Sequence, residues 1–331
     1  MHNEELAAIA KKLVTPPKGI LAIDESTETC TKRFEKLGIE STEENRRAYR
    51  ELLITTPLIE QYVSGMIMVD ETIRQHTKEG KPFLEIFKEK GMEAGIKVDG
   101  GLEQFGNSPI EKITKGLEGL PERLREYKSL GITFAKWRAV YFIKNNLPSD
   151  ELIAESTIRL VKYAKMCQEA GIVPIVEPEV LMTGEHTLEQ TEKVISDVLD
   201  VLFIRLAQQN IFMPGLLLKT GMVVPGDKVE KATPEEVRDA TLRCLGDYVP
   251  KNIGGVVLLS GGLDEESATI YLNALHNTGD LPWPLTFSYG RAIQNPALTL
   301  WAKDMSGVGE AQKALLERAQ ANSKASVGEY I

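Results

Sequence analysis

GITFAKWRAV, residues 131–140, joins a core strand to two cations on one of its faces. Side chains alternate between the two faces of a β-strand, so Lys136 and Arg138 continue the face that Ile132 and Phe134 begin. That face is apolar in its first half and positively charged in its second half. We interpret the stretch as a buried strand that ends in a functional site.

Seven other short apolar runs occur along the chain. They are GILAID (19–24), YVSGMIMV (62–69), GIKVD (95–99), GIVPIVEPE (171–179), GLLLK (215–219), IGGVVLLSGG (253–262) and PLTFSYG (284–290). Several begin with glycine, as expected where a helix ends and a strand follows.

Periodic polar segments separate these runs. Apolar residues recur at three- and four-residue steps over 188–209, which indicates a helix. Thr233, Pro234 and Glu236 form a capping-box pattern at the start of 233–248. Further helices are predicted over 3–13, 149–171, 264–279 and 306–326.

Eight runs alternating with helices predict an α/β fold, a (β/α)₈ TIM barrel with a parallel sheet. No run is followed by G-x-G-x-x-G or a P-loop, which argues against an open dinucleotide-binding sheet. We predict a single barrel domain over residues 1–331. It has an N-terminal helix, a C-terminal helix and a mobile tail at 327–331.

Composition excludes several classes of function. The 331 residues carry a net charge of −9, whereas nucleic-acid-binding domains are usually basic, so no nucleic-acid partner is expected. No apolar run approaches the ~20 residues that span a bilayer, and the acidic N-terminus does not resemble a signal or transit peptide. Cys30, Cys167 and Cys244 form no disulfide or metal motif, which is consistent with a reducing compartment. We expect a cytoplasmic protein without a membrane partner.

Polar side chains end nearly every run, and a barrel places its active site at the carboxyl ends of its strands. Taken singly, such residues are usually surface lysines, helix caps or turn glycines. Their convergence on one face indicates an active site, because a structural barrel has no need to bury so many charges. They are Asp24, Glu25 and Ser26; Lys97 and Asp99; Lys136 and Arg138; Glu177 and Glu179; Lys219; Ser260, Gly261 and Gly262; and Ser288, Tyr289, Gly290 and Arg291.

Lys219 follows three leucines and is the candidate nucleophile. A lysine amine attacks a carbonyl only when it is neutral, and burial and neighbouring cations lower a lysine pKa. Lys136 and Arg138 are expected to supply those cations. The resulting imine is an electron sink, suited to making or breaking a carbon–carbon bond, and carboxylates must then move protons. The candidates are Asp24, Glu177 and Glu179.

A separate observation concerns phosphate. Barrels often bind phosphate through the loops after strands seven and eight, which here contain LSGG and SYGR. Gly261 and Gly262 let backbone N–H groups approach an anion, and Arg291 can bind it with two hydrogen bonds. Arg33 and Lys97 are candidates for a second anion. These residues predict a carbon–carbon lyase that acts through a lysine imine on a phosphorylated carbonyl compound.

Eight motifs, in order, resemble class I fructose-bisphosphate aldolase over nearly the whole chain. They are LAIDEST (21–27), ENRRAYRELLITTP (44–57), GIKVD (95–99), FAKWR (134–138), VEPE (176–179), LLLK (216–219), LSGG (259–262) and FSYGRA (287–292). The resemblance implies a metal-free (β/α)₈ enzyme of glycolysis and gluconeogenesis without a cofactor. It reversibly cleaves fructose 1,6-bisphosphate to dihydroxyacetone phosphate and glyceraldehyde 3-phosphate. Sugar phosphates are the implied small-molecule partners, and a homotetramer is the implied assembly.

The same resemblance assigns roles to the site residues. Lys219 forms the Schiff base, and Glu177 is the general acid and base for forming and hydrolysing it. Asp24 takes the proton from the C4 hydroxyl, while Lys136 and Glu179 tune the electrostatics of proton transfer. The matched binding positions are Arg138 at the C6 phosphate; Ser260, Gly261, Gly262, Ser288, Gly290 and Arg291 at the other phosphate; and Ser26, Arg33 and Lys97 as further contacts.

Four features depart from the family pattern and bear on substrate preference and rate. Thr220-Gly221 replaces the usual Pro-Asn, Glu28 replaces a glycine, and Gly100 stands where a lysine often follows IKVD. Tyr330, one residue before the C-terminus, is the candidate for the mobile catalytic tyrosine of the family. A frayed terminus is the alternative interpretation of Tyr330.

Three other functions fit the sequence less well. A metal-dependent aldolase needs a histidine cluster, but His2, His76, His186 and His276 show no ligand spacing. A non-catalytic scaffold that binds a partner protein has no need of all three of Lys219, Glu177 and Asp24. Transaldolase, another imine-forming barrel, explains two anion sites less well.

Overall fold

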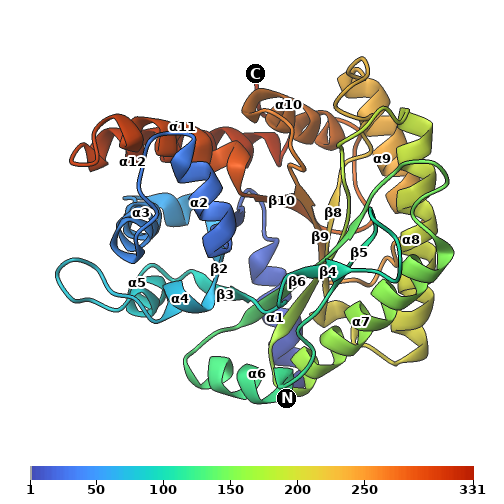
Figure 1. Cartoon of the computed structure of the whole chain (residues 1–331), viewed down its shortest axis with the longest axis horizontal. Helices are drawn as coiled ribbons and strands as arrows, with labels where there is room; N and C mark the ends of the chain where they lie inside the picture. Colours follow the sequence, from blue (N-terminus) through green and yellow to red (C-terminus); the bar gives the residue numbers. More distant parts are fainter. Residues whose placement is uncertain (1) are drawn as a thin grey trace.

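Eight parallel strands close into a barrel in the computed structural model, which describes residues 2–331. Met1, the first residue of the predicted domain, lies outside the described residues. Helices surround the strands (Figure 1), so the TIM-barrel prediction is confirmed. From neighbour to neighbour the strands are β1 (Gly19–Ala22), β10 (Leu285–Tyr289), β9 (Gly255–Leu259), β8 (Leu217–Gly221), β7 (Val173–Val180), β6 (Phe134–Tyr141), β3 (Glu93–Lys97) and β2 (Val63–Met68).

Side-chain hydrogen bonds cap the amino ends of several helices. Thr233 and Glu236 form the predicted capping box, and Thr187 and Gln190 form a second one. The α-helices are α1 (His2–Leu13), α2 (Thr27–Glu35), α3 (Glu43–Thr55), α4 (Asp70–Ile73), α5 (Phe83–Glu89), α6 (Leu120–Ser129), α7 (Asp150–Glu169), α8 (Leu188–Gln208), α9 (Pro234–Tyr248), α10 (Glu265–His276), α11 (Arg291–Lys303) and α12 (Val308–Ala325). Two 3₁₀ helices span Ile59–Gln61 and Met213–Gly215.

One antiparallel hairpin stands outside the barrel. Its strands, β4 (Leu102–Gln104) and β5 (Lys112–Thr114), pair with each other and lie between β3 and β6 in the chain. All three residues of β4 are exposed, so they carry no burial pattern that a sequence reading can detect. The hairpin was therefore not predicted.

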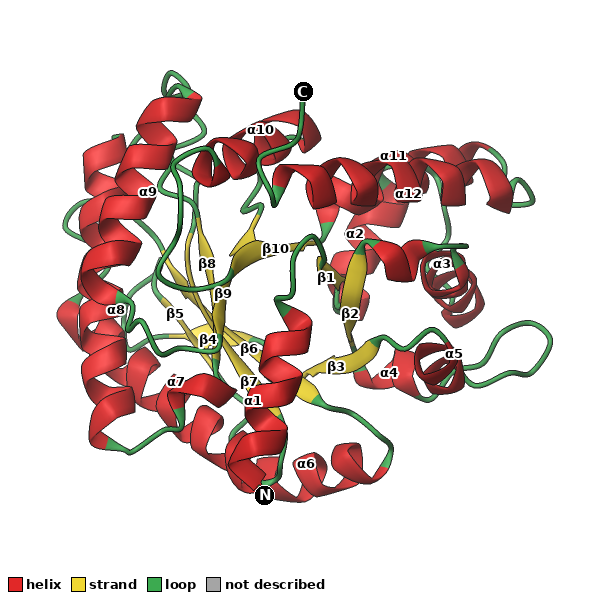
Figure 2. Cartoon of the chain, turned by 180° about the vertical axis from the view of Figure 1, so that it is seen from behind, coloured by secondary structure: helices red, strands yellow, loops and turns green. Residues whose placement is uncertain are grey.

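The inside of the barrel is filled at its amino end. Leu6, Ala10 and Leu13 of α1 pack against the inward side chains of the strands, and Figure 2 shows α1 crossing in front of them. The inward strand residues of this inner cluster are Ile20, Ala22, Ile67, Phe134, Val173, Ile175, Leu217 and Val257. The polar side chains of the interior therefore lie past this inner cluster, toward the carboxyl ends of the strands.

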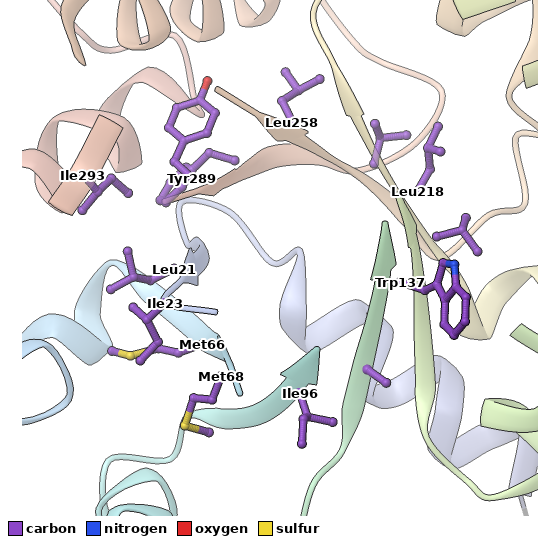
Figure 3. Packing of buried hydrophobic residues seen from close by; sticks show 14 of the residues in the cluster. Leu21, Ile23, Met66, Met68, Ile96, Trp137, Leu218, Leu258, Tyr289 and Ile293 are labelled. Carbon is purple, nitrogen blue, oxygen red and sulfur yellow. The ribbon is translucent and has the colours of Figure 1, made fainter. Parts of the chain in front are cut away.

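A larger cluster packs between the strands and the helices. Figure 3 shows Leu21, Ile96 and Trp137 among its members, pointing outward from β1, β3 and β6. Ile132 also belongs to this outer cluster, so the expectation that it shares the inward face with Phe134 is wrong. The reason is local: the backbone N–H of Ile132 still bonds Tyr127 of α6, and β6 begins only at Phe134.

Gly95 of β3 faces the ring of Phe134 inside the barrel. A Cβ built on Gly95 would lie 2.2 Å from Cζ of Phe134, and that ring is fully buried. We expect Gly95→Ala to lower the free energy of unfolding in urea by about 1–3 kcal/mol, because a filled core resists added volume.

Gly246→Ala is the matched control. Gly246 lies within α9 and a Cβ there would meet no atom within 4 Å. This substitution should leave stability unchanged or raise it by up to about 1 kcal/mol, because alanine favours a helix. Equal effects of the two substitutions would contradict the tight contact at Gly95.

None of the helices in the described part of the chain combines the length and the hydropathy needed to cross a bilayer.

Candidate active site

A cavity of about 570 Å³ opens at the carboxyl ends of the barrel strands. It brings together most residues that the sequence pattern singled out. Those lining it are Asp24, Ser26, Arg33, Lys97, Lys136, Arg138, Glu177, Glu179, Lys219, Ser260, Gly261, Ser288, Gly290 and Arg291.

The period of two along each strand explains this convergence. Phe134 belongs to the inner cluster, so Lys136, two residues on, points into the same interior. In the same way Ile175 leads to Glu177, and Leu217 leads to Lys219. Each of these three strands, β6, β7 and β8, therefore contributes an apolar residue to the inner cluster and a charged residue to the cavity.

Four of these side chains form a buried chain of alternating charge. Nζ of Lys136 lies 2.7 Å from Oδ2 of Asp24 and 2.9 Å from Oε2 of Glu177. The other carboxylate oxygen of Glu177, Oε1, lies 3.1 Å from Nζ of Lys219. Lys136, Glu177 and Lys219 are each only 4% exposed. Two cations and two anions balance, which makes the burial of four charges tolerable.

The pKa values of these groups follow from their neighbours. Burial acts to raise the pKa of Asp24, but the charges of Lys136 and Lys219 outweigh it and lower the pKa to about 2. The same opposition lowers the pKa of Glu177. Burial acts to lower the pKa of Lys136, but Asp24 and Glu177 raise it above its ordinary value. Lys136 is therefore a permanent cation between two carboxylates.

Asp24 is expected to give the protein acid-sensitive stability. A carboxyl whose pKa is lower in the folded chain stabilises the fold above its unfolded pKa of about 3.9, and that stability is lost as the pH falls toward about 2. The shift corresponds to about 2.5 kcal/mol. Asp24→Asn should therefore flatten the fall in unfolding free energy between about pH 5 and pH 2.5, measured by urea denaturation. An unchanged slope would contradict the ionised, paired state of Asp24.

Anion-binding groups gather at the start of α11. Gly290 caps this helix, Arg291 is its first residue, and both residues line the cavity. The first N–H groups of a helix have no partner within the helix and suit an anion. Ser288 is buried, and its hydroxyl has no hydrogen-bond partner among the described residues. Gly262 does not line the cavity, but a Cβ on it would lie 3.9 Å from Nη2 of Arg291. Gly261 and Gly262 both have positive φ, as a tight turn requires.

Other cations at the rim are paired with carboxylates. Nε of Arg138 donates to Glu179, and Nζ of Lys97 lies 2.5 Å from Oδ1 of Asp99. Burial opposes the charged form of Arg138, but Glu179 and Glu177 raise its pKa. Arg291, by contrast, is exposed and has no ion pair or hydrogen bond within residues 2–331.

The structure does not bring Tyr330 to this cavity. Its backbone N–H donates to Oδ1 of Asn273 at 3.0 Å, and Asn273 lies about 12 Å along α10 from the end nearest the cavity. Gly328, with φ of +74°, turns the chain after α12, and the N–H of Glu329 bonds Lys324. The predicted mobile tail, 327–331, thus begins as a hydrogen-bonded turn, and none of its residues lines the cavity.

Two acidic residues in the site were not assigned a role from sequence. Asp99 pairs with Lys97, and Glu25 pairs with Arg33 and Arg50. Both follow predicted strands, which was the available signal. Leu102 of β4 also lines the cavity and is 43% exposed. It was missed because the hairpin itself was missed.

Histidines do not gather in this site. Within residues 2–331 there is no group of three or more His, Cys, Asp or Glu side chains that could hold a metal ion. His186 lines a second, larger cavity of about 830 Å³ between the loops after β6 and β7. That cavity contains none of the predicted site residues.

The sequence model of the family described as Fructose-bisphosphate aldolase class-I matches residues 5–331. The chain belongs to the class I fructose-bisphosphate aldolases. The aldolase is accordingly a glycolytic carbon–carbon lyase that acts on sugar phosphates by metal-independent Schiff-base chemistry.

Relatives match this aldolase over its whole length. It is 50% identical to a probable fructose-bisphosphate aldolase class 1 of Xanthomonas campestris pv. campestris, over 100% of this chain and 99% of the relative. It is 48% identical to "Fructose-bisphosphate aldolase 4, cytosolic" of Arabidopsis thaliana, over 100% of this chain and 84% of that relative. A solved structure of fructose-bisphosphate aldolase from Plasmodium falciparum, in complex with TRAP and a small molecule inhibitor, has a TM-score of 0.98 at 43% identity. It covers 100% of this chain and 96% of that chain.

Proposed function

We propose that Lys219 is the Schiff-base nucleophile of this aldolase and that Glu177 moves its protons. The observation that carries this assignment is the 3.1 Å contact between Nζ of Lys219 and Oε1 of Glu177 inside a buried site. A buried amine beside a carboxylate can pass its proton on and become a nucleophile.

The steps follow from the chemistry of fructose 1,6-bisphosphate. Nζ of Lys219 attacks the C2 carbonyl, and Glu177 protonates the departing hydroxyl so that water leaves and an iminium forms. Asp24 takes the C4 hydroxyl proton, the C3–C4 bond breaks, and its electron pair moves into the iminium to give an enamine. Glyceraldehyde 3-phosphate leaves. Protonation of C3 and hydrolysis of the iminium then release dihydroxyacetone phosphate and restore Lys219.

The remaining residues stabilise the charged carboxylates and bind the substrate phosphates in this proposal. Lys136 keeps Asp24 and Glu177 ionised, and Glu179 pairs with Arg138, the residue proposed to bind the C6 phosphate. The start of α11 and the glycine turn after β9 suit the other phosphate. The residues proposed to contact substrate phosphates are Arg138, Ser26, Arg33, Lys97, Ser260, Gly261, Gly262, Ser288, Gly290 and Arg291.

The cellular setting is also a proposal. A homotetramer follows from the family resemblance, as does a single barrel domain. A cytoplasmic location is supported by Cys30, Cys167 and Cys244, which are all free and buried. A net charge of −9 supports the absence of a nucleic-acid partner.

Borohydride trapping tests the assignment. The protein is mixed with dihydroxyacetone phosphate, with and without a chelator, then reduced and mapped by mass spectrometry. An adduct on Lys219 that survives the chelator is the expected result. An adduct on Lys136 would overturn the assignment of the nucleophile while keeping the mechanism. No adduct, in a protein that binds the phosphate, would overturn the imine mechanism itself.

A further inference from the structure

Two consecutive amides on α11, Gln294 and Asn295, do not line the cavity and have no role in the mechanism above. Gln294 is fully buried, and both the nitrogen and the oxygen of its side-chain amide form hydrogen bonds. Its Nε2 donates to the backbone oxygen of Ala22 at 2.5 Å and to Oε1 of Glu25 at 3.0 Å. Its Oε1 accepts from the hydroxyl of Tyr49 at 2.9 Å. A fully satisfied buried amide is a rigid element, since any rotation would leave polar atoms unpaired.

Both amides also hold the guanidinium of Arg33. Nη1 of Arg33 donates to Oε1 of Gln294 at 3.1 Å, and Nη2 donates to Oδ1 of Asn295 at 3.1 Å. Nδ2 of Asn295 is itself anchored on Oε1 of Glu265, at 2.9 Å. Nη1 of Arg33 donates to Glu25 as well. These contacts use three of the five N–H donors of a guanidinium, so donors remain for a ligand.

The chemistry of an amide suits this position. An amide oxygen orients a guanidinium without neutralising its charge, whereas each carboxylate added there would compete with a bound anion. Glu25 is the one carboxylate paired with Arg33 in the described residues. Arg33 lines the cavity and is only partly exposed, so its position is set by these neighbours rather than by solvent.

The same helix carries a second cation that lines the cavity. Arg291 begins α11, and Gln294 and Asn295 follow three and four residues later, one helical turn away. One rigid helix thus presents Arg291 directly and places Arg33 through its amides.

We propose that Gln294 and Asn295 are positioning residues that fix the Arg33 guanidinium relative to Arg291, so that α11 sets the spacing of two substrate-binding cations. The inference rests on the proposed contact of Arg33 with a substrate phosphate. It predicts that losing an amide costs affinity for the substrate through Arg33 and through no other group.

A double-mutant cycle tests this. We expect Arg33→Met to raise KM for fructose 1,6-bisphosphate by on the order of 10-fold or more, since a charge-assisted contact is lost. Gln294→Met and Asn295→Ala should each raise KM by roughly 3–10-fold with kcat nearly unchanged. In the Arg33→Met background neither should raise KM further, because coupled residues are non-additive.

Gln312→Met is the matched control. The amide of Gln312, on α12, donates to the backbone oxygen of Leu52 and to Thr55 of α3, at 3.1 Å each, but does not reach the cavity. Its KM should equal that of the parent enzyme. A similar rise in KM for Gln312→Met would show a general effect of helix packing and overturn the proposal.

The remaining outcomes distinguish the role of Arg33 in substrate binding from the positioning role of the two amides. An unchanged KM for Arg33→Met would overturn the proposed role of Arg33 in substrate binding. A large effect of Arg33→Met, with equal effects of the amide variants in both backgrounds, would overturn only the positioning role. If circular dichroism shows that Gln294→Met does not fold, Asn295→Ala, at a half-buried position, decides the question alone.

Discussion

Lys219→Met is expected to lower kcat/KM for fructose 1,6-bisphosphate by on the order of 10⁴-fold or more and to abolish borohydride trapping. Methionine fills the same space but cannot form an imine, and losing a covalent nucleophile removes the whole reaction path. The site stays folded in this prediction, because Lys136 still pairs with both Asp24 and Glu177. Initial rates in a coupled assay, together with mass spectrometry of the reduced mixture, measure both effects.

Lys193→Met provides the control for a lysine-to-methionine change. Lys193 lies on the surface of α8, where its side chain is 74% exposed and pairs with Asp197. Exposed ion pairs contribute little, so activity should not change. An adduct that persists on another lysine in Lys219→Met, with substantial turnover, would contradict the assignment of the nucleophile.

Glu177→Gln is expected to lower kcat by roughly 10²–10⁴-fold, the usual contribution of a general acid or base. Glutamine keeps the shape but cannot take a proton from Lys219 or give one to the departing hydroxyl. It also removes the negative charge shared by Lys136 and Lys219. Rapid-quench trapping should show slow formation of the adduct, which still appears on Lys219 at long times.

Glu179→Gln distinguishes proton transfer from simple loss of charge. Glu179 is also buried and paired, but with Arg138 rather than with either lysine. Its replacement should slow adduct formation much less than Glu177→Gln does. Equal slowing by the two variants would indicate that the net charge of the site, and not the proton carried by Glu177, controls imine formation.

Much of the site could be predicted because strand geometry is local. A period of two carries Phe134 to Lys136, and Leu217 to Lys219, within three residues of chain. The carboxyl ends of parallel strands meet at one face, so fourteen of the sixteen proposed site residues line one cavity. The two exceptions are Gly262, on which a Cβ would lie 3.9 Å from Nη2 of Arg291, and Tyr330, which is bonded to Asn273 of α10.

The electrostatic environment was harder to predict than the membership of the site. The sequence suggested that Lys136 would act as a cation that lowers the pKa of a neighbouring lysine. In the structure Lys136 lies between Asp24 and Glu177, and these two carboxylates raise its own pKa. The residues at the strand ends predict which charged side chains share the site. They do not predict which of them form ion pairs, because that depends on the register of neighbouring strands.

From the sequence by itself the barrel, the Schiff-base chemistry and the face of the proposed site could be predicted, since alternating runs and the period of two along each strand are visible in the chain. Only the tertiary structure decided that Gln294 reaches Arg33, 261 positions away in the chain, and that Tyr330 packs against α10 instead of the cavity. The first contact depends on the packing of α11 and α12 against α2 and α3, where Trp301 touches Phe34 and Tyr49. Packing of the closed barrel and its helices brings together residues that are far apart in the chain. No local periodicity relates such residues, so their ion pairs and hydrogen bonds could not be predicted from sequence patterns.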